Sequence, residues 1–360
     1  MKEQILLASI IVLVTFIFSA VIMGLMRKVA YHIGAIDKPS NAEGRRHIHK
    51  KEVAKLGGVG IFLAFLFGYM LFGEQSIRMN SILIGSFIII LTSIVDDIKS
   101  IKATYKLTGH LIAACIIVFY GGILLNNITA FGLHFDFGWF AYPLTIFFLV
   151  ACTNIINLID GLDGLSGGIC SIFFATIAVI AISQGRYNSL VLILSLIMLG
   201  STLGFLLHNF YPAKIFAGDA ATFLGFIIGV ITLLEFKGPA LISFFVPVAI
   251  LGIPILDTLF AIIRRLLKGQ PPFKADREHL HHQLLGITSS QLKTVLIIYA
   301  IDILFAAASI CYVLVDRTIG QIIYIIIFII FLWFILHTTI ISDKSPTFTK
   351  KMKNKILGVK

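Results

Sequence analysis

Eleven apolar runs, separated by short polar segments, occupy most of this sequence: 5–26, 57–72, 81–95, 107–125, 139–156, 165–183, 190–207, 220–234, 240–263, 294–315 and 319–341. A helix of about 20 residues crosses a hydrocarbon core about 30 Å thick, and most of the runs approach that length. Hydrophobic residues form 58% of the chain and charged residues 13%, which is about half the charge of a soluble domain. A soluble globular fold and a disordered chain are therefore excluded. We expect an all-α integral membrane protein with about eleven transmembrane helices.

Smaller features of the sequence indicate structure rather than chemistry. The four cysteines form no Cys-x-x-Cys pair and lie inside apolar runs, so we interpret them as core residues rather than metal ligands or disulfide partners. The first run is too long for the apolar part of a signal peptide, and we expect an uncleaved span. The segment 126–138 alternates apolar and polar residues around Gly132, which predicts a small hairpin.

The basic residues are divided very unequally between the two sides of the predicted membrane protein. With eleven spans, one side carries 24 of the 29 lysines and arginines and the other side carries five. Since basic loops stay in the cytoplasm, we place the first side there and the N-terminus outside. The net charge of +11 then reflects topology rather than a nucleic-acid partner.

This topology predicts one polytopic catalytic domain, 1–343, and a basic cytoplasmic tail, 344–360. The tail is expected to lie against anionic lipid headgroups. The cytoplasmic loops of the domain are expected at 27–56, 96–106, 157–164, 208–219 and 264–293.

The polar residues that need an explanation all fall on the predicted cytoplasmic side. Ionisable groups at membrane depth cost about 3 kcal/mol or more, and they mark functional sites by default. Asp96 and Asp97 end the third run, where acids oppose the helix dipole. A solvated helix end is the alternative, but adjacent carboxylates suit a base or a magnesium neighbour. Positive charge near them is available from lysines at 99, 102 and 106.

The segment 154–165 spaces its polar residues three apart. Asn154, Asn157 and Asp160 would share one face of a helix, and the two Asp-Gly steps at Asp160 and Asp163 would then end it. Asn and Asp beside Gly are also common turn residues. Four oxygen-bearing side chains in one register favour a site for a hard cation and phosphate.

Two further segments add candidate ligands. Asp219 precedes an apolar run, so it is either a simple helix cap or a metal ligand beside backbone N–H groups that face an anion. The histidines in 276–282 have a spacing that superficially suggests zinc. Because the other strong candidate ligands are oxygens, we interpret these histidines and Arg277 as donors to phosphate or sugar.

Taken in order, these motifs resemble the polyprenyl-phosphate N-acetylhexosamine-1-phosphate transferases, of the glycosyltransferase family 4 type. The resemblance rests on Asp96-Asp97, the sequence NIINLIDGLDGL, the segment 216–219 and the sequence HLHH, and it extends from the first cytoplasmic loop through the tenth run. It is nearest to the undecaprenyl-phosphate GlcNAc-1-phosphate transferases of bacterial plasma membranes. The translocases that load UDP-N-acetylmuramoyl-pentapeptide carry three consecutive histidines instead of HLHH. The usual proline before Gly57-Gly58 is also replaced here.

The resemblance implies roles for individual residues. Asp219 and Asn157 match the positions that hold Mg²⁺, for which Mn²⁺ is a substitute, on the diphosphate. Phe216 matches the aromatic residue that stacks on uracil. Asn154 and Asp163 match positions of the nucleotide pocket.

The remaining roles concern the acceptor and the sugar. Lys106 matches the basic residue near the lipid phosphate, and Asp96 and Asp97 match the pair discussed as the base. The loop with HLHH matches the element that closes over sugar and phosphates. Asp160, His281 and His282 complete the expected catalytic set, and Arg277 and His279 the expected nucleotide and sugar contacts.

We therefore predict a Mg²⁺-dependent enzyme that transfers GlcNAc 1-phosphate from UDP-GlcNAc to undecaprenyl phosphate and releases UMP. The resemblance makes this the first membrane step of a glycopolymer such as teichoic acid or O-antigen. The pentapeptide translocase is the alternative enzyme, and a secondary transporter is the alternative of another class. Transporters place polar residues at the midplane and show repeat halves, which this chain does not. Direct attack and an aspartyl intermediate both remain open, as do monomer and homodimer.

Overall fold

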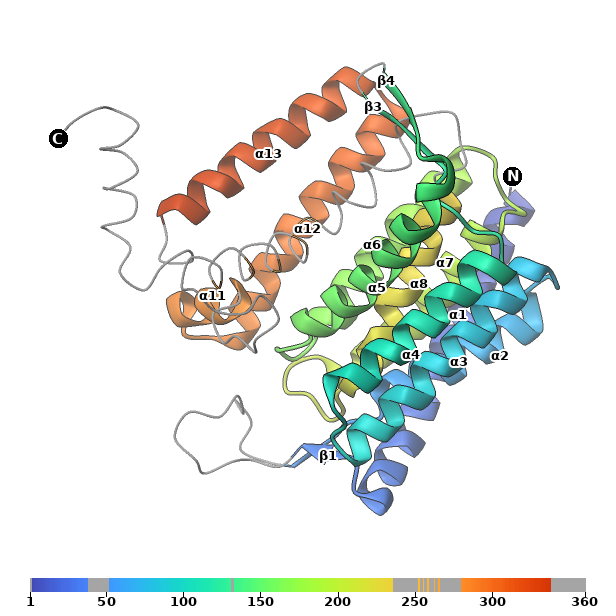
Figure 1. Ribbon diagram of the computed structural model, residues 1–360. Helices are drawn as coiled ribbons and strands as arrows, with labels where there is room; N and C mark the ends of the chain where they lie inside the picture. Colours follow the sequence, from blue (N-terminus) through green and yellow to red (C-terminus); the bar gives the residue numbers. More distant parts are fainter. Residues whose placement is uncertain are drawn as a thin grey trace.

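The computed structural model describes residues 2–37, 52–130, 133–235 and 280–337, together with Gly252, Ile255, Thr258, Ile262 and Arg265. This part of the chain is a bundle of long helices with two short hairpins (Figure 1). The helices are α1 (Lys2–Ile33), α2 (Gly57–Phe72), α3 (Ile77–Ile98), α4 (Ala103–Cys115), α5 (Ala141–Ile159), α6 (Leu165–Ser183), α7 (Leu190–Asn209), α8 (Ala221–Glu235), α11 (Leu280–Thr288), α12 (Gln291–Leu314) and α13 (Arg317–His337).

Short elements extend or connect the helices. A π-helical turn, η1 (Ile116–Tyr120), continues α4, and 3₁₀ turns precede α5 and α8 as η2 (Gly138–Phe140) and η3 (Gly218–Ala220). Strand β1 (Ile36–Asp37) pairs antiparallel with β2 (Val53–Ala54). Strand β3 (Asn127–Ala130) pairs antiparallel with β4 (Leu133–Asp136), so the hairpin predicted for 126–138 is confirmed.

The expected membrane spans correspond closely to observed helices. The runs 57–72 and 165–183 match α2 and α6 residue for residue, and eight others overlap one helix each. The run 240–263 falls outside the described residues, apart from isolated helical positions. Within the described part of the chain, seven helices are long and apolar enough to cross a membrane, and α2, 218–234 and 318–327 are shorter apolar helices. The all-α membrane fold is confirmed.

Some helices of this bundle begin with a serine cap. Ser76 accepts a hydrogen bond from Met79 N at the start of α3, and Ser189 accepts one from Leu192 N at the start of α7. A serine hydroxyl satisfies one of the free N–H groups of the first turn, which matters most where water is scarce.

Helix α8 forms the centre of the bundle. All its described side chains up to Leu233 are buried, as expected for a helix that is apolar on every face. Phe223 contacts Phe62 and Phe65 of α2, and at Gly225 the backbone of α5 comes so close that no side chain would fit. By contrast, α1, α3, α4 and α13 expose many large apolar side chains, which suits a lipid-facing surface.

The polar helix ends meet at one end of the bundle. The C-terminal ends of α3 and α5 and the start of α4 lie there near strand β1 (Figure 1), and hydrogen bonds of Asp219 with Asp97 and Asn157 place η3 beside them. Since the start of the central helix α8 lies at this end, a side chain on η3 is buried between several helices.

Candidate active site

Asp219, on η3, is the centre of the polar cluster. Its side chain is 6% exposed. Lys106 Nζ and Asn157 Nδ2 both donate hydrogen bonds to Asp219 Oδ1, the latter at 3.2 Å. The other oxygen, Oδ2, is buried and has no hydrogen-bond partner in the described part of the chain. A buried carboxylate oxygen without a donor is costly, so Oδ2 is free to take a further ligand.

Asp97 holds the turn that carries Asp219. Both oxygens of Asp97 accept from the backbone N–H of Asp219, at 3.1 and 3.2 Å. Gly218 has a φ of +71°, and a Cβ there would lie 2.5 Å from Asp97 Oδ2 and would overlap the carbonyl oxygen of Lys55. Glycine is therefore required at this position by conformation and by space.

Asp96 points to a different partner. Its Oδ1 accepts from Ile101 N at 3.0 Å, and its Oδ2 accepts from Lys106 Nζ at 3.1 Å. Lys106 thus joins α3, α4 and η3 through Asp96 and Asp219. These contacts offset the unfavourable placement of two acids at the C-terminal end of α3.

The charges of this cluster suit a divalent cation. Two carboxylates, of Asp96 and Asp219, pair with one ammonium, of Lys106, which leaves a formal charge of −1. Among the described residues no three His, Cys, Asp or Glu side chains form a ready metal cage. Mg²⁺ commonly uses one or two protein carboxylates and completes its shell with water and substrate phosphates. Asp219 and Asn157 are the two residues whose side-chain oxygens fit this pattern as metal ligands.

The turn 160–164, between α5 and α6, carries the two predicted aspartates of the Asp-Gly steps. Asp160 Oδ1 accepts from Ser166 Oγ at 2.5 Å. Burial raises the pKa of Asp160 to about 6, and the Ser166 hydroxyl opposes that shift while Asp163 adds to it. Asp163 Oδ2 accepts from Ala213 N at 2.9 Å, so Asp163 ties this turn to the segment that leads to Phe216. Its predicted nucleotide role stays a prediction.

Phe216 is half-buried and is held through its backbone. Its N–H donates to Ala54 O at 2.7 Å, and its carbonyl accepts from Gly57 N at 2.8 Å. These two backbone hydrogen bonds join the segment before α8 to the segment before α2, and neither of them involves the Phe216 ring.

Asn154 lies one helical turn before Asn157 and has other partners. Its Nδ2 donates to Val150 O at 2.7 Å and lies 3.3 Å from His110 Nδ1. His110, 2% exposed, was missed in the sequence. Its signal was its position four residues after Lys106, which places both on one helix face.

Asn209 was missed as well, although it is a lone amide at the end of an apolar run. It is 1% exposed. Its Oδ1 accepts from Gly164 N at 3.0 Å, and its Nδ2 donates to Ile215 O at 2.9 Å. Asn209 therefore bridges the turn 160–164 and the segment leading to η3.

The predicted residues of the histidine loop are not placed. Arg277 and His279 lie outside the described residues, as do the side chains of His281 and His282, although the backbone of both belongs to α11. Their predicted roles stay predictions.

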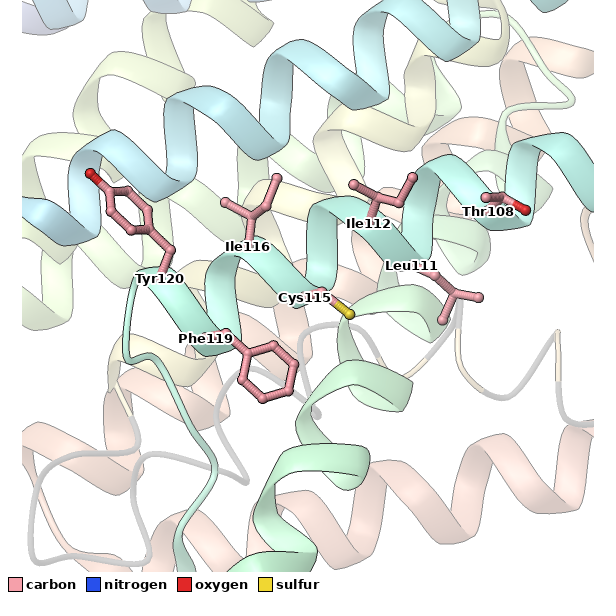
Figure 2. Close-up of a pocket in the computed structure, with 7 residues that line it drawn as sticks. All are labelled: Thr108, Leu111, Ile112, Cys115, Ile116, Phe119 and Tyr120. Carbon is pink, nitrogen blue, oxygen red and sulfur yellow. The ribbon is translucent and has the colours of Figure 1, made fainter.

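A shallow apolar hollow of about 400 Å³ lies along α4 and η1. Figure 2 shows the side chains that line it along the helix: Thr108, Leu111, Ile112, Cys115, Ile116, Phe119 and Tyr120. Its first residue, Thr108, is two positions after Lys106. Because positions two apart on a helix point to nearly opposite sides, this hollow lies on the face of α4 away from Lys106.

Comparisons with known proteins show the family of this chain. The model of "Glycosyl transferase family 4" matches residues 79–235, which contain every described residue of the cluster. A Bacillus subtilis (strain 168) protein named "Probable undecaprenyl-phosphate N-acetylglucosaminyl 1-phosphate transferase" is 41% identical over 97% of this chain and 96% of its own length.

More distant relatives carry related names. The "Decaprenyl-phosphate N-acetylglucosaminephosphotransferase" of Mycolicibacterium smegmatis is 30% identical, over 77% of this chain and 75% of its own. The "Undecaprenyl-phosphate alpha-N-acetylglucosaminyl 1-phosphate transferase" of Salmonella typhi is also 30% identical, over 77% and 76%. Family match, near full-length similarity and the order of the motifs agree, and the chain belongs to glycosyl transferase family 4.

Proposed function

We propose that this protein transfers N-acetylglucosamine 1-phosphate from UDP-GlcNAc to undecaprenyl phosphate, giving undecaprenyl-diphospho-GlcNAc and UMP. The observation that carries the proposal is the cluster around Asp219, built from the ends of α3, α4, α5 and α8 in a bundle with an apolar outer surface. The names of the relatives support the same donor sugar and acceptor lipid.

The reaction exchanges one phosphorus–oxygen bond for another. An oxygen of the lipid phosphate forms a bond to the β-phosphorus of UDP-GlcNAc, and the bond from that phosphorus to the bridging oxygen breaks. The bridging oxygen and its electron pair leave with UMP. Three anionic phosphates must come together, so a site for this reaction needs positive charge and precise placement.

The side-chain oxygens of the cluster suit Mg²⁺ as ligands. Asp219, whose Oδ2 has no partner among the described residues, and Asn157, 3.2 Å from Oδ1, are the residues that would hold it. When bound, the ion supplies charge neutralisation for the diphosphate. Asp97 does not need to bind the ion in this scheme, because its carboxylate holds the Asp219 backbone in place.

Lys106 is the residue proposed for the lipid phosphate. Its side chain is 22% exposed, so its ammonium is partly accessible while it pairs with Asp96 and Asp219. The next residue of α4, Leu107, exposes a large apolar side chain, which suits a lipid chain that lies against this helix. A phosphate at Lys106 would gain charge-assisted hydrogen bonds.

We also propose that this end of the bundle faces the cytoplasm. The supporting observation is the division of basic residues, 24 against five, between the two sides. A nucleotide-sugar donor is a cytoplasmic compound, so the proposed reaction requires the same orientation.

The test uses the full-length protein purified in detergent with Mg²⁺. UMP release is measured with UDP-GlcNAc in the presence and absence of undecaprenyl phosphate, and with UDP-N-acetylmuramoyl-pentapeptide as the competing donor. We expect UMP with UDP-GlcNAc that depends on the lipid. Better turnover of the pentapeptide donor would refute the donor assignment, and UMP release without the lipid would refute the acceptor.

A further inference from the structure

The turn 160–164 is held by three hydrogen bonds from outside α5 and α6. Two involve the end of α7 and the segment after it: Ala213 N donates to Asp163, and Asn209 Oδ1 accepts from Gly164 N. The third comes from α12, where the phenol hydroxyl of Tyr299 donates to the carbonyl oxygen of Gly164 at 2.5 Å. Tyr299 is 135 positions from Gly164 in the sequence, so this contact depends on the packing of α12 against α6.

The packing at this contact is built for a tyrosine ring. Gly164 and Gly168 are four residues apart, and Tyr299 lies over both at the start of α6. A Cβ at Gly168 would overlap the phenol ring, and a Cβ at Gly164 would lie 3.3 Å from its hydroxyl. Gly164 also has a φ of +81°, which a residue with a side chain rarely adopts. Both glycines are therefore needed for the ring to reach the Gly164 carbonyl.

A hydrogen bond between side chains also joins α12 to α11. At the corner between them, Thr288 Oγ1 and Thr294 Oγ1 are 2.6 Å apart, and Ser290 caps α12. Tyr299 lies about two turns beyond this corner. The backbone of α11 carries positions 281 and 282, which belong to the predicted donor-binding loop. One tyrosine thus connects the Asp160 turn to the helix pair that continues this loop.

We propose that Tyr299 is a positioning residue of the transferase: its hydroxyl, bonded to the Gly164 carbonyl, fixes the turn 160–164 against α12. The role of this turn in turnover rests on the proposed function, since Asp160 is one of its predicted site residues. Tyr299 itself touches no substrate in this scheme. It acts by keeping Asp160 and Gly164 in one arrangement relative to Asn157 and Asp219.

The decisive variant is Tyr299→Phe. Phenylalanine keeps the ring on Gly168 and removes only the hydroxyl, so the Gly164 carbonyl loses its donor from α12. We expect kcat for UMP release to fall about tenfold, as for the loss of one well-placed hydrogen bond. KM for UDP-GlcNAc and for undecaprenyl phosphate should change by less than about twofold, because the variant removes no substrate contact.

A second readout does not depend on activity. Hydrogen–deuterium exchange of peptides covering 160–168 should become faster in Tyr299→Phe, since the turn opens more often. Exchange in peptides from α2 and α8 should stay as in the wild type. A purely structural effect would instead accelerate exchange throughout the bundle.

Tyr324→Phe is the matched control. Its hydroxyl, on α13, lies 2.5 Å from Ser309 Oγ of α12, so the variant also removes a tyrosine hydroxyl from a hydrogen bond that involves α12. We expect wild-type kcat and wild-type exchange at 160–168. The proposal is overturned if Tyr299→Phe keeps wild-type kcat, if its exchange at 160–168 is unchanged, or if both variants lose kcat equally. A wild-type enzyme that releases no UMP from UDP-GlcNAc would refute the proposed function instead.

Discussion

Replacing Asp219 by asparagine tests the centre of the site with the smallest change in shape. The substitution keeps the volume of the side chain and removes one negative charge and one acceptor oxygen. In the structure, Asp219 Oδ1 takes hydrogen bonds from Lys106 and Asn157, and Oδ2 is buried without a partner among the described residues. The variant therefore weakens the interaction with Lys106 and with a cation at Oδ2.

The size of the effect follows from the burial of this carboxylate. Its side chain is 6% exposed, so little of its charge is screened by water. A unit charge about 4 Å from another, at an effective dielectric constant of about 20, contributes about 4 kcal/mol. If the transition state loses that amount, kcat/KM falls about 10³-fold. Folding should survive, because Lys106 keeps its bond to Asp96.

The assay is UMP release at several Mg²⁺ concentrations, together with the thermal midpoint of the detergent-solubilised protein. Asp316→Asn is the control, since Asp316 is exposed beside α13 and its Oδ1 accepts from Thr318 N and Ile319 N. Asparagine serves such a cap about as well as aspartate, so this variant should keep wild-type turnover. Activity of Asp219→Asn within about tenfold of the wild type at ordinary Mg²⁺ would refute the reasoning.

Three further predictions concern the turn before α8, the membrane topology and the acid of the α5–α6 turn. Gly218→Ala should reduce turnover by at least about 10²-fold, because its Cβ would collide with Lys55 O and Asp97; activity near that of the wild type would contradict the geometry. After replacement of the native cysteines, Ser183→Cys should react with an impermeant thiol reagent outside intact cells and Lys214→Cys should not; the reverse pattern would refute the orientation. The folded pKa of Asp160, about 6, lies above the ordinary value of 3.8 for this side chain, so its contribution to stability is greatest below pH 4 and declines as the pH rises through 6. Asp160→Asn should abolish that part of the pH dependence of the thermal midpoint, and an unchanged profile would argue against a raised pKa of Asp160.

Much of the fold could be predicted because apolar length is a direct signal in a membrane protein. The runs 57–72 and 165–183 reproduce α2 and α6 exactly, since each is bounded by polar or glycine-rich sequence. The ends of α1 were less predictable. It extends to Ile33, past basic residues that can reach the membrane surface with long side chains, so hydropathy alone ended the span at 26.

The sequence predicted which residues belong to the candidate site better than it predicted which of them contact one another. Asp96, Asp97, Asn157 and Asp219 were identified because polar residues at membrane depth are costly. Their pairing could not be read from the sequence. Asp96 and Asp97 are neighbours, yet one pairs with Lys106 and the other with the Asp219 backbone, because successive side chains on a helix diverge by about 100°.

The sequence by itself determined the class of protein, the helices and the polar residues of the site, since each of these follows from local composition and spacing. Tertiary structure alone decided which helix ends meet and which groups serve as supports. His110 with Asn154, Asn209 between two loops, and Tyr299 on Gly164 are joined across 44, 45 and 135 positions of sequence. Such contacts arise when helices pack at close range, and packing depends on the shapes of surfaces far apart in the chain. Hydropathy and motif spacing describe only neighbours in sequence, so these supports became visible when α4, α7 and α12 were placed against α5 and α6.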